Sequence, residues 1–139
     1  LALSNEALIS LTRDSMDRLV DATGESAYLS IAASGRRGLY IAIAEGTHSV
    51  RHANWVGRTF PLERSAAGRA LSGEIAAGES IVVGDGVEPD VTGIAVPLVT
   101  HDRVVGALSV VVPSYRITAQ RAEEISAALR AEARFIAQV

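Results

Sequence analysis

The chain has 139 residues, of which 48% are apolar, and its formal net charge is −3. This length fits one domain built around one hydrophobic core. The sequence contains no cysteine, which excludes disulfides, thiolate nucleophiles and thiolate metal sites. No apolar run is long enough to span a bilayer, so we expect no membrane contact and take a cytoplasmic protein as the default.

The basic residues are all arginines, thirteen in number, and they are scattered among acidic neighbours. No basic stripe can form from them, and the chain is therefore not expected to bind nucleic acid by itself. The first residue is Leu rather than Met, which suggests a fragment of a longer protein.

The first quarter of the chain predicts a helix followed by strands. A helix is expected from Leu3 to about 20–22, because apolar residues recur at helical spacing and charged residues fall largely on another face. The segment 22–24 ends it with a glycine. The alternation that follows predicts an antiparallel meander. Its strands are expected at 27–33, 39–45 and 49–53, with a hairpin loop at 34–38.

The middle of the chain predicts a second helix, from Ser65 to about Ala77, interrupted by Gly68 and Gly73. A short strand is expected at 80–83. A loop of Gly, Pro and Asp residues follows at 84–90.

The last third predicts a hairpin and a helix. The strands 93–99 and 104–112 are nearly all apolar, which favours a central sheet that is covered on both faces. Thr118 is expected to cap a final helix that runs to the C-terminus. The pattern predicts an α+β single domain around one antiparallel sheet.

The start of the second helix is a candidate anion site. Ser65 is a good N-cap, and the next three residues have almost no side chain to shield the backbone amides. Gly68 costs about 1 kcal/mol of helix propensity relative to Ala, so it needs a reason. The reason is either a ligand or a helix that packs close to the sheet.

Enzymatic and metal-binding patterns are weak, and we expect no catalytic residue, metal or cofactor. His48 and His52 would lie roughly 13 Å apart on a strand, too far to share a metal, and His101 falls in a solvated hairpin loop. The acidic residues in 84–90 could offer carboxylate oxygens to a hard cation, but they are too few to form a calcium-binding loop.

Several segments together resemble the effector-binding domain of bacterial IclR-type transcription regulators, over most of the chain. The resemblance lies in their order and spacing rather than in any one of them. The segments are Gly24 to Ser26, His48 to Arg51, Gly57, Pro61 and Leu62, Ser65 to Leu71, Gly93 to Leu98, Val105 to Val110, and Pro113.

The resemblance implies a GAF-like or profilin-like domain covering residues 1–139, with the first helix joined to an upstream winged helix-turn-helix that is missing from this chain. It also implies a pocket between the sheet and the second helix, with backbone amides at Ala66 and Ala67 holding an effector carboxylate. The full set of implied effector-binding residues is Ser65, Ala66, Ala67, Gly68, Asp85, Gly93 and Ser109. Arg51 and Arg64 could counter an anion or be solvated.

Three departures from the family pattern concern the pocket. Gly93 replaces a common Cys or Ser, and Val111 stands where a second Ser is found. Only Ser72 to Val83 fills a gap where the family places a few tens of residues that help to enclose the effector.

The function implied is a sensor for a small carboxylate or aromatic acid that also forms a homodimer or homotetramer, with DNA contacts made by the missing N-terminal part. The alternative is a structural dimerisation module with a degenerate pocket and no ligand. An enzyme on this fold is not expected, because the methionine sulfoxide reductases that resemble it need cysteine.

Overall fold

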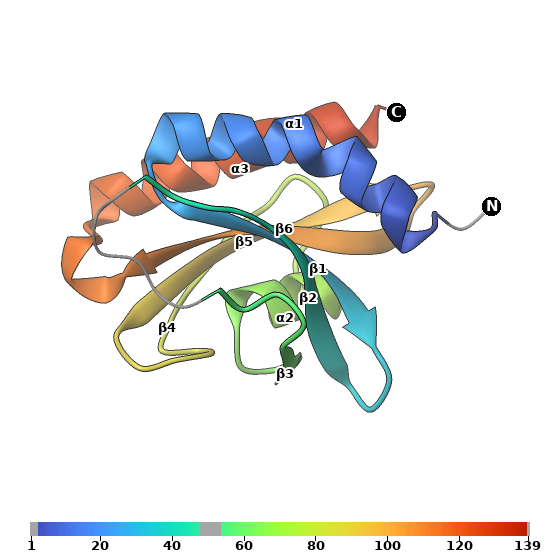
Figure 1. The fold of residues 1–139 in the computed structure, drawn as a ribbon, viewed down its shortest axis with the longest axis horizontal. Coiled ribbons are helices and arrows are strands. Elements are labelled where there is room, and N and C mark those ends of the chain that lie inside the picture. Colours follow the sequence, from blue (N-terminus) through green and yellow to red (C-terminus); the bar gives the residue numbers. More distant parts are fainter. Residues whose placement is uncertain (1–2, 48–53, 139) are drawn as a thin grey trace.

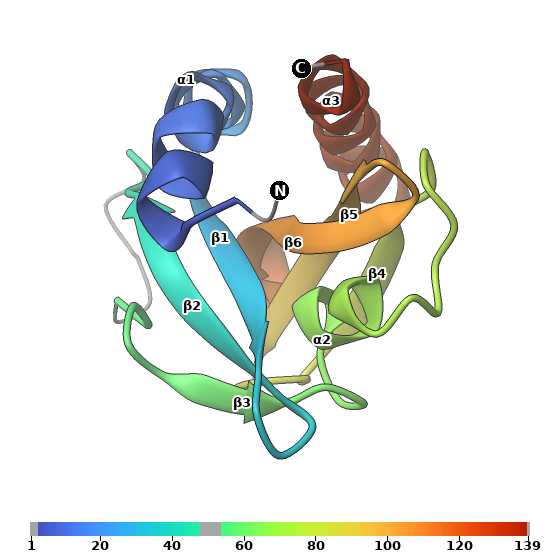
Figure 2. The same cartoon turned by 90° about the vertical axis from the view of Figure 1, so that its right-hand side faces the viewer.

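A computed structural model of the chain describes residues 3–47 and 54–138. Its centre is a six-stranded sheet in the order β3-β2-β1-β6-β5-β4, in which all neighbouring strands are antiparallel. Helices α1 and α3 lie side by side over one face of the curved sheet, and α2 lies against the other face (Figure 1, Figure 2). The α+β class predicted from the sequence is confirmed. The elements are α1 (Asn5–Thr23), β1 (Ser26–Ala33), β2 (Arg37–Ala44), β3 (Thr59–Pro61), α2 (Ala66–Leu71), β4 (Ile81–Gly84), β5 (Val91–Thr100), β6 (Arg103–Pro113), the 3-10 turn η1 (Ser114–Arg116) and α3 (Ala119–Ala137).

The ends of α1 and α3 follow from local chemistry. Ser4 caps α1 by accepting a hydrogen bond from the amide of Ala7 at 3.1 Å. Gly24 ends the helix in the left-handed conformation, with a φ of 74°, and its N–H donates to the carbonyl of Val20. Thr118 caps α3 in the way the sequence predicts, accepting from the amide of Arg121 at 3.0 Å.

The middle of the chain differs from its prediction. The second helix is only six residues long and does not reach Ala77, because the chain turns at Ser72 and then takes a left-handed conformation at Gly73, with a φ of 81°. Residues 72–80 form turns that lead to β4. The strand predicted at 49–53 lies outside the described residues, whereas β3 at Thr59–Pro61 was not predicted.

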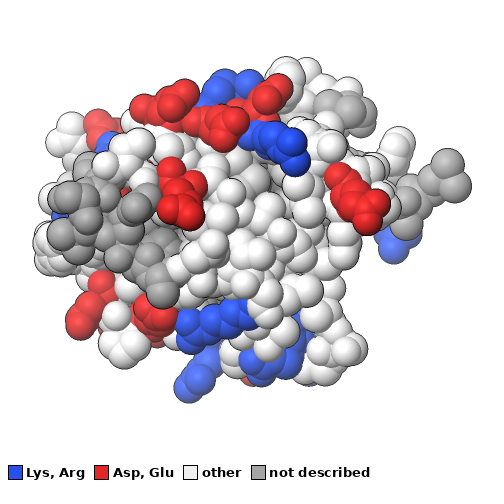
Figure 3. Space-filling view, in the orientation of Figure 1, with Lys and Arg blue, Asp and Glu red and all other residues white. Residues whose placement is uncertain are grey.

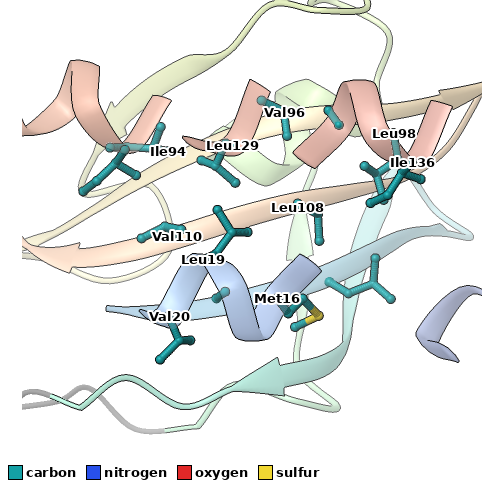
Figure 4. Close-up of a cluster of buried hydrophobic side chains, with 14 of the residues drawn as sticks. Met16, Leu19, Val20, Ile94, Val96, Leu98, Leu108, Val110, Leu129 and Ile136 are labelled. Atoms are coloured by element: carbon teal, nitrogen blue, oxygen red, sulfur yellow. The ribbon is translucent and has the colours of Figure 1, made fainter. Parts of the chain in front are cut away.

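Alternation along β1, β5 and β6 separates two apolar clusters. In β5, Ile94, Val96 and Leu98 face α1 and α3, whereas Ala95 faces α2. Figure 4 shows side chains of α1 and α3, among them Leu19 and Leu129, meeting these strands in the larger cluster. The prediction that the central hairpin is covered on both faces is therefore confirmed.

Ion pairs tie the two long helices to each other and to the sheet. Arg18 of α1 donates two hydrogen bonds to Glu132 of α3, at 2.8 and 3.0 Å. Arg116 pairs at 2.8 Å with Glu25, whose side chain is only 5% exposed. Arg121 also donates to the carbonyl of Thr23. The segment after β6 is therefore held against the end of α1. Among the described residues, no helix combines the length and the apolar character needed to cross a bilayer.

Titration of Glu132 tests the contact between α1 and α3. Hydrogen bonds from Arg18 hold the pKa of Glu132 below its ordinary value of 4.5. A carboxyl group whose pKa is lowered by folding stabilises the fold above its unfolded pKa, and this contribution is lost as the pH falls through the folded value. We predict that Glu132→Gln lowers the free energy of unfolding at pH 7 and that the difference from the parent shrinks as the pH falls below 4.5. Urea unfolding of both proteins at a series of pH values measures this difference. A difference that does not depend on pH would contradict a stabilising ion pair between Arg18 and Glu132.

Candidate functional site

Four aromatic side chains gather on the α2 face of the sheet. Trp55 stacks on Tyr28 with ring centroids 5.5 Å apart and an interplanar angle of 18°. Tyr40 lies 5.5 Å from Trp55 and 4.5 Å from Phe60. Burial raises the pKa of Tyr28 to about 12 and raises the pKa of Tyr40 as well. Both phenols are therefore protonated at neutral pH.

The start of α2 has the cap that the sequence predicts. Ser65 accepts a hydrogen bond from the amide of Gly68 at 2.9 Å. The amides of Ala66 and Ala67, the first two of the helix, have no hydrogen-bond partner within the described parts of the chain.

Close packing explains Gly68. A Cβ at position 68 would lie 2.2 Å from the carbonyl oxygen of Leu62, which is far inside contact distance. By contrast, a Cβ at Gly93 would meet the Cβ of Ala66 at 3.5 Å, an ordinary contact. Of the two reasons that the sequence leaves open for Gly68, the structure supports close packing, although the contact is with the Leu62 backbone just after β3 rather than with the sheet.

A small cavity lies between α2 and the sheet. The volume open to water inside it is about 20 Å³. This is room for roughly one water molecule. Its walls come from β2, α2, the strands β4 to β6, the loop 84–90 and the turn around residue 55. They are Tyr40, Trp55, Ser65, Ala66, Ala67, Val83, Gly86, Val87, Val91, Gly93, Ser109 and Val111.

The hydroxyl of Ser109 is a polar group in the wall of this cavity. Ser109 lies on β6, is 2% exposed, and its hydroxyl has no hydrogen-bond partner among the described residues. A buried hydroxyl without a partner costs on the order of 1–3 kcal/mol. That cost falls away if a ligand or a water molecule bonds to the hydroxyl.

Five of the seven residues expected at the site line the cavity, and two do not. Ser65, Ala66, Ala67, Gly93 and Ser109 line it. Gly68 packs on Leu62 instead. Asp85 is exposed, and its carboxylate accepts from the amide of Asp90 at 2.6 Å, so it shapes a turn. Neither Gly68 nor Asp85 lines the cavity, and the assignment of the seven residues to an effector stays a prediction.

Trp55 was not expected at the cavity, and the loop 84–90 contributes Gly86 and Val87 to its wall rather than Asp85. Trp55 and this loop are joined to each other. Glu88 accepts a hydrogen bond from the indole Nε1 of Trp55 at 3.0 Å and another from Arg58 at 2.9 Å. The guanidinium of Arg58 also lies 5.7 Å from the centroid of the Trp55 ring. The sequence offered little to predict this contact: a single Trp shortly before Gly57, and an acidic loop about thirty residues later.

Among the charged groups considered from the sequence, those that the structure describes do not line the cavity. Arg64 and His101 are exposed, whereas Arg51, His48 and His52 lie outside the described residues. Residues 3–47 and 54–138 contain no group of three His, Asp or Glu side chains that could hold a metal ion. Figure 3 shows a face whose centre is largely uncharged, with arginines gathered along its lower edge and a mixture of carboxylates and arginines along its upper edge.

Known structures share this fold. A structure of the IclR transcriptional regulator from Alicyclobacillus acidocaldarius superposes with a TM-score of 0.80 at 20% identity, and that of Thermotoga maritima IclR does so at 0.80 and 19%. An IclR homolog from Microbacterium hydrocarbonoxydans, complexed with 4-hydroxybenzoate, gives 0.75 at 20% identity. The three alignments cover 93%, 94% and 94% of this chain, and 66%, 67% and 67% of those proteins. The chain therefore spans about two thirds of their length.

The sequence itself identifies the family. Residues 1–80 match the family described as bacterial transcriptional regulator IclR C-terminal. The chain thus belongs to that family of transcriptional regulators, which are not enzymes as a class. No curated protein matches the chain.

Substitution of Gly68 tests the close packing of α2. Helix propensity alone predicts that Gly68→Ala stabilises the domain by about 1 kcal/mol. Because the new Cβ would collide with the Leu62 carbonyl, we predict a loss of about 1–3 kcal/mol in urea unfolding.

Gly84→Ala is the matched control. A Cβ at position 84 has only the hydroxyl of Thr92 nearby, at 3.8 Å, and the backbone φ there is not positive. We expect this variant to unfold within about 0.5 kcal/mol of the parent. If Gly68→Ala proved as stable as Gly84→Ala, packing against Leu62 would not explain the glycine.

Proposed function

We propose that residues 1–139 form the effector-binding and oligomerisation domain of an IclR-type regulator, which senses a small carboxylate or aromatic acid in the cavity between α2 and the sheet. The proposal rests on Ser109, a residue of the cavity wall whose buried hydroxyl has no hydrogen-bond partner among the described residues. The amides of Ala66 and Ala67 would hold the carboxylate, and Ser109 would bond to a second polar group. The Microbacterium homolog complexed with 4-hydroxybenzoate supports this class of ligand on the same fold.

DNA binding belongs, in this proposal, to a winged helix-turn-helix joined upstream of α1, and the regulator works in the cytoplasm as a homodimer or homotetramer. The signal would travel as a shift between two arrangements, because an effector biases only states that it binds with different affinity. Strand β6 lines the cavity, and the Glu25–Arg116 pair joins the segment after β6 to the end of α1. This contact offers a physical link between effector and helix.

A second function is favoured by the size of the cavity. A volume of about 20 Å³ does not admit an aromatic acid in this conformation. The short connection of residues 72–80 also leaves out the segment that usually helps to enclose the effector. Both observations fit a dimerisation module that binds no ligand.

Removing the Ser109 hydroxyl tests the effector site. Ser109→Ala deletes an unsatisfied buried hydroxyl, so we predict that the unliganded variant gains up to about 1 kcal/mol of stability. The same substitution should weaken binding of an aromatic acid such as 4-hydroxybenzoate. Thermal unfolding over a ligand titration measures both effects, because a ligand at 100 times its Kd stabilises by about 2.7 kcal/mol.

Ser30→Ala is the control, since Ser30 is also buried without a hydrogen-bond partner among the described residues but does not line the cavity. It should change the unliganded stability and leave the ligand response intact. If no small carboxylic acid raised the melting temperature of the parent while sedimentation showed a stable oligomer, the dimerisation module would be the better account.

A further inference from the structure

Binding of an aromatic acid requires one wall of the cavity to move. The cavity holds about one water molecule, whereas an apolar cavity that binds benzene measures on the order of 150 Å³. The walls made by Ala66, Ala67 and Gly93 have no side chain that can retract. The valines at 83, 91 and 111 are held in the sheet by its hydrogen bonds.

Trp55 is the largest wall that stands outside the helices and strands. Its side chain is attached to a turn whose backbone is anchored independently of the indole. Within that turn, the amide of Gly57 donates to the carbonyl of Tyr40 at 2.8 Å and the amide of Arg58 donates to the carbonyl of Trp55 at 2.9 Å. The amide of Trp55 itself donates to the hydroxyl of Tyr28 at 3.0 Å. The indole can therefore rotate away while the turn stays in place.

The outer edge of the indole is held by a contact that water can reach. Glu88 bonds to both Trp55 and Arg58, and the side chains of Arg58 and Glu88 are 45% and 32% exposed. Exposed pairs of this kind contribute little to stability. The residue as a whole is 3% exposed, and the face of its ring stacks on Tyr28.

We infer that Trp55 is an internal occupant of the effector cavity: its indole lies where the ring of an aromatic effector binds, and the effector must displace it from Tyr28 and Glu88. This inference rests on the proposed function, since it concerns the same cavity. The space that the indole leaves borders the rings of Tyr28 and Tyr40, and the same cavity is lined by Ser109. It fits a planar ring of indole size that carries one acidic group, better than a short aliphatic acid.

Displacement has a consequence for affinity. If only a fraction of the molecules has the indole out of the cavity, the apparent Kd is the intrinsic Kd divided by that fraction. Trp55→Ala removes the occupant, and we predict that it binds 4-hydroxybenzoate at least about tenfold more tightly than the parent. It should also bind indole, a neutral ring, which the parent should not bind. Isothermal titration of both probes measures this.

Phe60→Ala is the matched control. Phe60 belongs to the same aromatic cluster and is 2% exposed, but it does not line the cavity. Equal affinities of the parent and Trp55→Ala for both probes would overturn the inference, as would equal indole binding by Phe60→Ala and Trp55→Ala. In the first case the proposed function would survive, because the parent would still bind the acid.

Trp55→Ala removes a large buried side chain, so a second measurement uses a milder change. Trp55 is the only tryptophan of the chain, and its emission therefore reports on this one site. In the parent, 4-hydroxybenzoate should make the indole severalfold more accessible to acrylamide quenching. Glu88→Ala removes only the outer contact of the indole and should lower the ligand concentration at which this exposure appears. An effector that binds while the indole stays buried would overturn the inference.

Discussion

The alternation of side chains along β5 and β6 is the constraint on which this structure depends. Because both faces of these strands are apolar, both must be covered. The residues that face α1 and α3 are larger than those that face α2, where Ala95 and Ala107 lie. The small side chains on one face allow α2 to lie close to the sheet. The larger side chains on the other face pack against the two long helices α1 and α3.

The closeness of α2 determines what the second face can do. Its first residues have almost no side chain, and Gly68 lets its backbone rest on Leu62. Opposite them, β6 presents a hydroxyl that finds no partner among the described residues. The result is a cavity whose polar groups are the amides at the start of α2 and the hydroxyl of Ser109. Its other walls are largely apolar and include the indole of Trp55. A packing requirement and the proposed ligand site thus share the same glycine- and alanine-rich sequence.

Local chemistry explains which features the sequence predicted. The caps at Ser65 and Thr118 and the end of α1 at Gly24 depend on neighbours within four residues, and all three are confirmed. The strands of the central hairpin follow from their length and apolar character. The expected cavity residues were found where they lie on regular elements, at the start of α2 and on β5 and β6.

Contacts between distant segments explain what could not be predicted. The length of α2 depends on a turn after Leu71, and Gly68 faces a carbonyl six residues earlier. Trp55 gains its place from contacts with Tyr28 and Glu88, which lie 27 and 33 residues away. Asp85 is exposed and shapes a turn, and the sequence could not indicate this because an acidic residue in a loop serves equally well as a ligand group and as a turn former.

The most direct test of the account is a titration of the ¹⁵N-labelled domain with 4-hydroxybenzoate, followed by ¹⁵N–¹H correlation spectra. The account predicts saturable shifts that are largest at the amides of Ala66, Ala67 and Ser109, with the indole N–H of Trp55 moving at the same ligand concentration as its bond to Glu88 breaks. Shifts confined to exposed residues, or amides of α2 that do not respond while the ligand binds elsewhere, would contradict it.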